Sequence, residues 1–268
     1  KSVEKAILNI ENVEIIIINN GSNDNTLLKI NEFTEQCSIN FLNVLKTFDI
    51  KHVGLSEARN FGIGEAIGDY LSFVDADAIV DIHWLNEINR AFSKYQVDII
   101  SGRVNNLDND KFISTFLFNA HYSLINLKKK TKINHDKLST SVIGANMTFK
   151  KEIFTKTSGF FDQFSYRGDD TSFVTYLKTL GYKELYLNES IVFNDHTDSL
   201  YNWFKQQYNG GIANGIIKNT FKTLNVTKAV YYFIFFILLI TTPFFWFTFF
   251  GLFFIFIVRF LYSYDFLY

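Results

Sequence analysis

Two carboxylates stand one residue apart at the end of an apolar stretch of the chain. Residues 71–81 read LSFVDADAIVD, so Asp75 and Asp77 follow a run with the length of a β-strand. Alternate residues of an extended segment point to the same side, which lets both carboxylates face one ligand. In open α/β sheets ligands bind beyond the carboxyl ends of the strands, where two carboxylates can hold a divalent cation beside substrate phosphates. The alternative is that both acids cap the segment that follows.

A second acidic pair, Asp169 and Asp170, stands in the sequence RGDDTSF at the expected start of a helix. A carboxylate in that place can take a proton from an attacking hydroxyl as a general base. It can equally serve the helix, because acids at a helix N-terminus cap free N–H groups and interact favourably with the helix dipole. His196, in FNDHTDS, is a candidate metal ligand that would complete a site with Asp77.

Segments typical of strands alternate with segments typical of helices over residues 13–104. Apolar runs without polar alternation suit strands that are covered on both faces. The expected strands are 13–18, 39–46, 69–75 and 97–104, and the expected helices between them start near Asp24 or Asn25 and span 56–68 and 83–95. A further helix is expected later, over 169–182. This order predicts an α/β domain with a mostly parallel sheet flanked by helices.

The C-terminal part of the chain differs in composition from the rest. Residues 230–258 contain no charged residue, and Lys218, Lys222 and Lys228 precede them. A run of that length suffices to cross a membrane; a buried apolar hairpin is the alternative. We predict a large domain over 1–215, a basic interfacial linker over 216–228 and one or more transmembrane segments over 229–268. The positive-inside rule then places the large domain on the cytoplasmic face of the inner (plasma) membrane.

Composition argues against several classes of protein. The formal net charge is -1, whereas nucleic-acid partners usually require a strongly basic surface. Cys37 is the only cysteine, so the chain forms no internal disulfide and no cysteine-based metal site. Gly62, Gly64 and Gly68 do not form a dinucleotide fingerprint, because their spacing is wrong and they precede a strand rather than follow one.

The order of the motifs is more informative than any one of them. EIIIINNGSNDNT, GLSEARNFGIGEAIGDYLSFVDADA, GANMTFKKEIFTKTSGFFDQF, GDDTSF and DHTDS follow one another between Glu14 and about Gly215. Together they resemble the family 2 glycosyltransferases, which have the Rossmann-like GT-A fold. The resemblance implies an inverting transfer of a sugar from a nucleotide-diphosphate-sugar donor to a hydroxyl acceptor. The acceptor would be a lipid-linked glycan or a cell-surface polysaccharide precursor, and membrane lipids would be further partners.

The resemblance also implies a role for each candidate residue. Asp75 and Asp77 match the D-x-D motif, with Asp75 near the nucleotide ribose and Asp77 on the Mn²⁺ or Mg²⁺ that bridges the diphosphate. The remaining assignments are Arg59 at the nucleotide base, Asp170 as general base with Asp169 as second candidate, His196 at the metal, and Gly144, Ala145 and Asn146 in the loop beneath the sugar.

Three departures from the family pattern bear on function. Asn19 and Asn20 stand where the family usually has two aspartates, which would alter or weaken nucleotide binding. The expected first strand, with a polar turn for the base, would precede Lys1, so either the chain is a fragment or the nucleotide pocket is incomplete. The Q-x-x-R-W motif of processive polysaccharide synthases is also missing. The alternative to an enzyme is therefore a non-catalytic membrane scaffold that keeps the fold. A nucleotidyltransferase would also use carboxylates to hold a metal, but it usually needs a glycine-rich phosphate loop, and no such loop is visible in this sequence.

Overall fold

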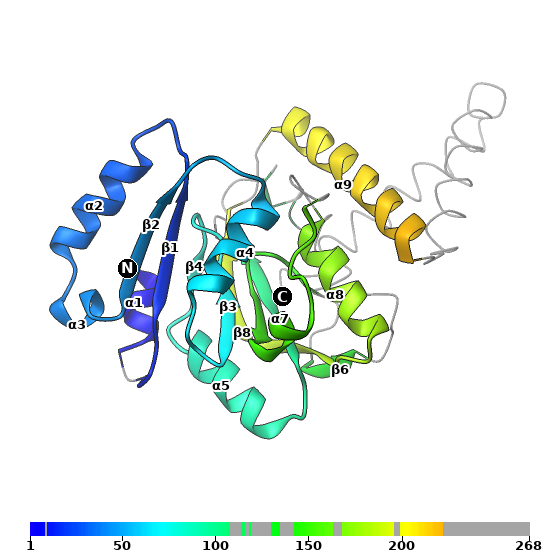
Figure 1. Cartoon of the computed structure of the whole chain (residues 1–268), viewed down its shortest axis with the longest axis horizontal. Helices are drawn as coiled ribbons and strands as arrows, with labels where there is room; N and C mark the ends of the chain where they lie inside the picture. The colour runs from blue at the N-terminus through cyan, green and yellow to red at the C-terminus, as the bar shows by residue number, and fades with distance from the viewer. Residues whose placement is uncertain are drawn as a thin grey trace.

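The computed structural model describes residues 1–8, 10–107, 114–115, 118, 130–134, 142–162, 168–195 and 199–221. Helices and strands alternate through most of this range (Figure 1). In chain order the elements are α1 (Ser2–Ala6), β1 (Ile15–Asn20), α2 (Thr26–Gln36), α3 (Ile39–Leu42), β2 (Leu45–Ile50), α4 (Leu55–Glu65), β3 (Tyr70–Phe73), β4 (Ile79–Val80), α5 (Trp84–Lys94), β5 (Ile99–Asn106), β6 (Lys132–Asn134), β7 (Met147–Lys150), α7 (Glu152–Lys156), α8 (Asp169–Thr179), β8 (Glu184–Asn194) and α9 (Leu200–Phe221).

The described strands form two sheets. β1 and β2 pair in parallel, as a strand–helix–strand unit requires, and lie with α2 and α3 to the left of the larger sheet in Figure 1. The larger sheet has the order β3-β7-β5-β8-β4, with β6 also paired to β8. In that sheet β5 and β8 run parallel, whereas the other ladders are antiparallel.

The prediction of a mostly parallel sheet was therefore wrong, and the sheet is mixed. The reason lies in β7, which enters the sheet between β3 and β5 and pairs antiparallel with both. β3 and β5 keep the common direction that their helical connection predicts, but they are no longer neighbours. The hydrophobic periodicities of strands and helices do not reveal such an insertion. They describe one segment at a time and carry no information on which strand it pairs with.

β1 and β3 each have one strand neighbour among the described residues, so each leaves one edge without a ladder partner. The starts of the two strands are joined by Glu14, whose Oε1 accepts hydrogen bonds from the N–H groups of Ile67 at 2.5 Å and Gly68 at 2.9 Å. Its Oε2 pairs with Lys46 at 2.8 Å. The first strand that the family resemblance expects stays a prediction.

Apolar side chains cover both faces of the larger sheet. Successive residues of β5 point to opposite faces, so that Ile99 joins one cluster and Ile100 the other. On the Ile100 side, α5 contributes Trp84, Ile88 and Ala91. The opposite cluster contains buried residues of β7, α7 and α8, namely Met147, Phe149, Ile153, Phe173, Val174 and Leu177. These layers fix α8 against the sheet.

One predicted strand began too early. Residues 39–46 were expected to be extended, but α3 occupies Ile39–Leu42 and the strand starts at Leu45. Ser38 explains the helical turn, because its side chain accepts a hydrogen bond from the N–H of Phe41 and caps it.

No helix in the described part of the chain is long and apolar enough to span a membrane. The predicted transmembrane segments over 229–268 lie outside the described residues, as does most of the linker predicted over 216–228.

Candidate functional site

Asp75 and Asp77 lie in the turn that follows β3. The N–H of Ala78 donates to the carbonyl oxygen of Asp75 at 3.0 Å, so this segment turns rather than continuing as a strand. The Asp75 side chain is 42% exposed, and Asp77 is exposed. The N-cap residue of α5 is His83, no side chain caps this helix, and Asp81 Oδ1 accepts from the N–H of His83 at 2.8 Å. Asp75 and Asp77 are thus not needed to cap α5.

Arg59 connects the two acidic motifs. It lies on α4, and its guanidinium forms an ion pair with Asp169 through Nη1 and lies 3.7 Å from Asp75 Oδ1 through Nη2. The same guanidinium stands 5.6 Å from the ring centre of Phe160, within cation–π range. The structure therefore brings Arg59, Asp75 and Asp169 together, although they are distant in the sequence.

Asp169 and Asp170 begin α8 after Gly168, whose φ of 87° lies in the left-handed region that favours glycine. Asp169 is buried against Arg59, whereas Asp170 is partly exposed. Asp170 Oδ1 accepts from the N–H of Thr171 at 2.6 Å, as acids in the first turn of a helix often do. A Cβ at Gly144 would stand 3.2 Å from Asp170 Oδ2 and 3.0 Å from Arg59 Nη2.

The site carries an excess of negative charge. Burial raises the pKa of Asp75, the Arg59 guanidinium opposes this rise, and the carboxylates of Asp77 and Asp170 add to it. Burial likewise raises the pKa of Asp169, with Arg59 opposing and Asp170 adding. Asp75 and Asp169 therefore face the Arg59 guanidinium, and Asp77 and Asp170 add negative charge beside them.

This donor set fits a divalent cation. Asp75 and Asp77 offer carboxylate oxygens that Mg²⁺ and Mn²⁺ accept, and a cation there would favour the ionised form of Asp75 against burial and against the neighbouring carboxylates, which both raise its pKa. The described residues contain no group of three or more His, Cys, Asp or Glu side chains arranged to hold a metal. His196, the expected third ligand, lies outside the described residues.

The side chain of Asn146 is committed to the fold. Its Nδ2 donates to the carbonyl oxygens of Arg103 and Ser190, each at 2.9 Å. Its Oδ1 accepts from Trp84 Nε1 at 2.9 Å and from the Ser190 hydroxyl at 3.4 Å. All four hydrogen-bonding positions of the amide are occupied, so Asn146 positions the loop that carries Gly144 and Ala145 rather than contacting a ligand with its side chain. Ala145 is buried.

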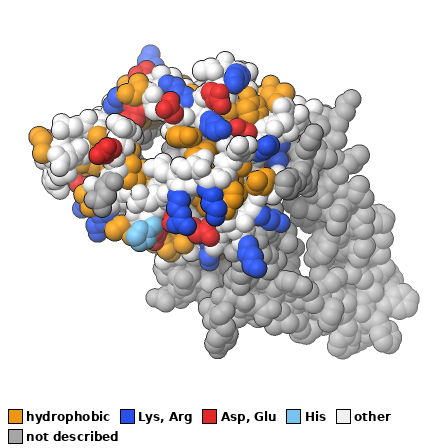
Figure 2. Space-filling model, turned by 90° about the horizontal axis from the view of Figure 1, so that it is seen from below, with side chains coloured by type: hydrophobic (Ala, Val, Ile, Leu, Met, Phe, Trp, Pro, Cys, Tyr) orange, Lys and Arg blue, Asp and Glu red, His pale blue; other side chains and the backbone are white. Residues whose placement is uncertain are grey.

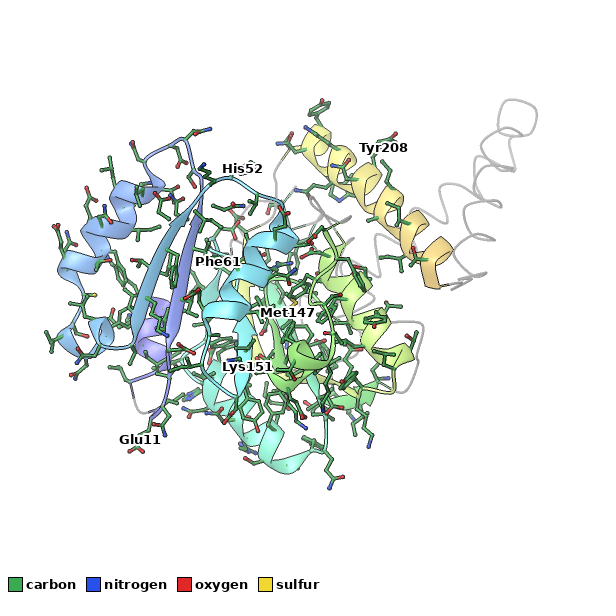
Figure 3. All side chains as sticks on the ribbon, in the orientation of Figure 1. Glu11, His52, Phe61, Met147, Lys151 and Tyr208 are labelled. Atoms are coloured by element: carbon green, nitrogen blue, oxygen red, sulfur yellow. The ribbon has the colours of Figure 1, made fainter. Side chains whose placement is uncertain are left out.

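Asn19 and Asn20 are bound mainly to neighbouring loops. Asn20 pairs with the backbone of Val53 in both directions, donating to its carbonyl oxygen and accepting from its N–H, each at 2.9 Å. Asn19 Nδ2 donates to Asp49 Oδ1 at 2.8 Å. The two amides therefore join the end of β1 to the end of β2 and to the loop before α4, where Figure 3 labels His52. The side-chain hydrogen bonds of Asn19 and Asn20 therefore lead to neighbouring loops and not to Asp75 or Asp170.

Sequence reasoning missed two residues that support Arg59. Asn60 exchanges two hydrogen bonds of 2.8 Å with the backbone of Phe160, and Ser56 donates to the carbonyl oxygen of Phe161 at 2.8 Å. These contacts hold α4 against the segment whose Phe160 ring lies beneath Arg59. The only available signal was their place beside Arg59 in SEARN.

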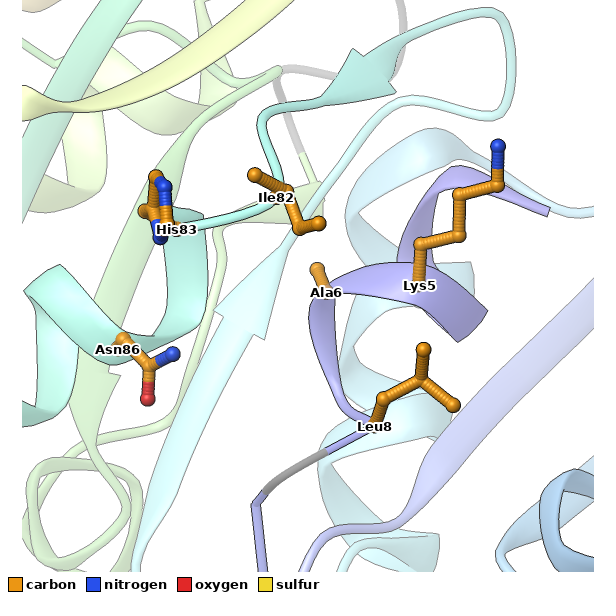
Figure 4. Close-up of a pocket in the computed structure, with 6 residues that line it drawn as sticks. All are labelled: Lys5, Ala6, Leu8, Ile82, His83 and Asn86. Atoms are coloured by element: carbon orange, nitrogen blue, oxygen red, sulfur yellow. The ribbon is translucent and has the colours of Figure 1, made fainter.

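A separate pocket of about 180 Å³ lies between α1, the end of β4 and the start of α5 (Figure 4). It is lined by Lys5, Ala6, Leu8, Ile82, His83 and Asn86. None of the predicted site residues lines it, so it does not belong to the carboxylate site.

The fold and the site define a class: a mixed α/β protein in which carboxylates that follow β3 meet an arginine of α4 and the acidic first turn of α8. The model of the family described as Glycosyl transferase family 2 matches residues 1–157. The chain belongs to this family. The GT-A type of fold expected from the resemblance is confirmed in its mixed α/β architecture with a central sheet and helices.

Three known proteins show how far the similarity reaches. Glycosyltransferase GlyA of Streptococcus pneumoniae is 30% identical over 92 residues, which are 34% of this chain and 12% of GlyA. Among solved structures, S. aureus TarS 1-349 superimposes with a TM-score of 0.54 at 14% identity, over 72% of this chain and 54% of that one. Mannosyltransferase PcManGT from Pyrobaculum calidifontis, in complex with GDP-Man and Mn²⁺, gives 0.50 at 18% identity, over 68% and 47%. The chain thus spans about an eighth of GlyA and about half of each structural neighbour.

Proposed function

We propose that this chain is an inverting glycosyltransferase that moves a sugar from a nucleotide-diphosphate-sugar donor to a hydroxyl acceptor. The observation that carries the proposal is the convergence of Asp75, Arg59 and the Asp169–Asp170 pair at the carboxyl end of β3. Family membership supports the same reaction class.

Asp170 is the proposed general base. The acceptor hydroxyl attacks the anomeric carbon of the sugar while its proton passes to the Asp170 carboxylate. The bond from that carbon to the diphosphate oxygen breaks, the nucleotide diphosphate leaves with the electron pair, and the configuration inverts because attack comes from the opposite face. Asp169 is less suited to this role, since Arg59 already binds its buried carboxylate.

Asp75 and Asp77 are the proposed ligands of Mn²⁺ or Mg²⁺, with His196 as a third. A bound cation supplies Lewis-acid stabilisation of negative charge on the departing diphosphate. The structurally similar mannosyltransferase PcManGT holds Mn²⁺ in its complex with GDP-Man, which is consistent with a divalent cation in this fold. Arg59 orders the site by holding Asp169 and by facing Asp75.

Donor binding through the NNGS segment follows a changed pattern. The side-chain NH₂ groups of Asn19 and Asn20 each donate one hydrogen bond to the protein, so each has a second N–H for a ligand. Nucleotide contacts in this segment would come from these N–H groups or from the backbone. The engagement of both amides also favours the alternative proposal, a non-catalytic membrane scaffold with the same fold. The retained carboxylates favour the enzyme.

The acceptor and the location are proposed from the sequence. The uncharged run over 230–258, with lysines before it, supports attachment to the inner membrane with the catalytic domain on the cytoplasmic face. Attachment there would bring the site close to a lipid-linked glycan or a precursor of a cell-surface polysaccharide.

Calorimetric titration tests the proposal directly. Mn²⁺ together with UDP, GDP or dTDP is titrated into the detergent-solubilised chain, with Asp77→Ala as the control. Metal-dependent binding of one nucleotide, lost in the variant, supports the donor site. Failure of every nucleotide to bind to the folded protein would favour the scaffold.

A further inference from the structure

One face of α9 exposes large side chains that a water-facing helix does not need. Tyr201 is 75% exposed, Tyr208 72% and Ile212 50%. Positions separated by seven and four residues fall on one stripe of an α-helix. Lys205 is exposed on the same stripe. Figure 3 shows Tyr208 projecting from the side of α9 that faces away from α8.

The opposite face of α9 is already docked. Ala213 and Ile217 are buried and form a small cluster with Phe161 and Ile216. The helix therefore has a defined orientation relative to the large domain, with one side packed and the other side presenting the two tyrosines and the isoleucine. If α9 rotated to cover the exposed stripe, the packing of Ala213 and Ile217 would be lost.

The charge pattern of the sequence from α9 onward favours an anionic partner. Between Ser199 and Tyr264 the sequence contains no Asp or Glu, but it contains five cationic residues: Lys205, Lys218, Lys222, Lys228 and Arg259. Elsewhere the two signs are mixed, as the face seen in Figure 2 shows for the large domain. Lysines without acids next to an uncharged run of membrane-spanning length are typical of juxtamembrane segments that attract anionic lipids.

The chain beyond α9 points to the same partner. α9 ends at Phe221, and the uncharged run begins only nine residues later, at Val230. Tyrosine is enriched at membrane–water interfaces because its ring is apolar and its hydroxyl is polar. A soluble protein partner would not account for an apolar stripe, an acid-free segment and a following run of membrane-spanning length together.

We propose that Tyr201, Tyr208 and Ile212 form a lipid-facing stripe, with which α9 lies in the headgroup layer of a membrane that contains anionic lipid. The proposal rests on the membrane attachment included in the proposed function. Tyr201 and Tyr208 would sit at headgroup level, Ile212 would reach the acyl boundary, and Lys205 would contact lipid phosphate. Because α9 packs on the large domain through Ala213 and Ile217, this contact would fix the orientation of the catalytic site relative to the membrane.

Site-directed fluorescence on the full chain tests the stripe. Cys37→Ser removes the native thiol, after which Tyr208→Cys carries an environment-sensitive label. Asn202→Cys is the matched control, because Asn202 is exposed on α9 but lies about 100° around the helix from Tyr201. The labelled chains are placed in phosphatidylcholine vesicles with or without phosphatidylglycerol, and quenching is measured with aqueous iodide and with nitroxide-bearing lipid.

With phosphatidylglycerol present, the emission of the label at position 208 is expected to shift to the blue and to be quenched by nitroxide lipid. Its quenching by iodide is expected to be severalfold weaker than that of the label at position 202. Equal quenching of both labels by iodide in the anionic vesicles overturns the proposal. Shielding of position 208 in detergent that grows with protein concentration also overturns it, since a second copy then covers the stripe. Nucleotide binding by calorimetry in detergent does not depend on the stripe, so failure here is distinct from failure of the proposed function.

Discussion

Arg59 and Asp169 form an ion pair across 110 positions of sequence, with the arginine side chain 12% and the aspartate side chain 4% exposed. The pair joins α4 to the first turn of α8. It also separates the roles of the two neighbouring acids, because Asp169 is held by Arg59 whereas Asp170 stands partly exposed beside Gly144. Because the Asp169 carboxylate is buried and engaged by Arg59, a substrate hydroxyl reaches Asp170 more readily, so accessibility favours Asp170 as the proposed base.

The first prediction is that Asp170→Asn lowers the rate of transfer by about 10²-fold or more, the scale on which a general base contributes. Donor binding should be unchanged, because the proposed ligands Asp75 and Asp77 are intact. Single-turnover kinetics together with calorimetric nucleotide binding measure the two effects separately.

Asp169→Asn provides the contrast. It leaves Arg59 without its closest buried partner, so the main expected effect is a lower unfolding temperature and weaker positioning, with a smaller direct effect on proton transfer. If Asp169→Asn abolishes transfer in a protein that remains as stable as the wild type, the base has been assigned to the wrong member of the pair.

The second prediction concerns the stability of the metal-free protein. Burial and the neighbouring carboxylates raise the folded-state pKa of Asp75 above its unfolded value, so the folded state binds a proton more tightly than the unfolded state. The free energy of unfolding contributed by Asp75 is therefore present at low pH and is lost as the pH rises through the window between the ordinary and the raised pKa. Asp75→Asn removes this loss.

We expect Asp75→Asn to unfold at a slightly higher temperature than the wild type at neutral pH without metal; the shift is small because solvent screens a side chain that is 42% exposed. The difference should vanish on acidification, since both side chains are then neutral. Thermal melts across pH measure it. A lower melting temperature for the variant at neutral pH would show that Asp75 stabilises the fold through contacts other than those described.

The third prediction is that Gly144→Ala impairs transfer more than stability. The new Cβ would come within 3.0 Å of Arg59 Nη2 and 3.2 Å of Asp170 Oδ2, so both side chains must shift by a few tenths of an ångström. Because misplacing a reacting group by 1 Å can cost about 10²-fold, a smaller loss of about tenfold in kcat is expected. Kinetics at saturating donor measure it.

Gly64→Ala is the matched control, since a Cβ at this position of α4 meets nothing within 4 Å. It should leave kcat unchanged and raise stability by roughly 0.5–1 kcal/mol, the usual gain for replacing glycine in a helix. An equal loss of kcat in both variants would mean that the effect of Gly144→Ala does not come from its contacts with Arg59 and Asp170.

The sequence was sufficient for the strand–helix order, the family and the two acidic motifs, because local periodicity, capping and motif order are properties of short segments. It was not sufficient for the mixed sheet, since the place of β7 between β3 and β5 depends on long-range pairing. It also did not show that Arg59 pairs with Asp169, because no local pattern connects residues on two separate helices.

Asn146 illustrates a second limit. Its motif GANMTF suggested contact with the sugar, whereas its amide lies among Trp84, Arg103 and Ser190 with all its hydrogen-bonding positions used. A motif marks a position that matters to the family's site, but it does not say whether the side chain touches the ligand or supports the backbone that does.

The last prediction concerns the opposite end of α8 from Asp170. Lys178 and Glu184 form a buried ion pair of 3.1 Å, and Glu184 also accepts from the Ser101 hydroxyl at 2.7 Å and from Asn134 Nδ2 at 2.9 Å. Lys178→Met leaves the Glu184 carboxylate buried without its cation, which should cost about 3–5 kcal/mol of unfolding free energy. Denaturant unfolding measures this cost.

The double variant Lys178→Met/Glu184→Gln tests whether the cost comes from charge. The Gln side chain is neutral and its carbonyl oxygen can still accept hydrogen bonds, so a large part of the lost stability should return. Glu184→Gln alone should also be destabilising, because the buried Lys178 then loses the carboxylate with which it pairs; the two single effects should therefore add to more than the effect of the double variant. Strict additivity would mean that the pair is not coupled and that the methylenes of Lys178 matter for packing alone. If the two stability effects are coupled and kcat of the double variant is normal, neutral side chains hold α8 against the sheet as well as the ion pair does. The position of Asp170 at the other end of α8 would then not depend on that ion pair.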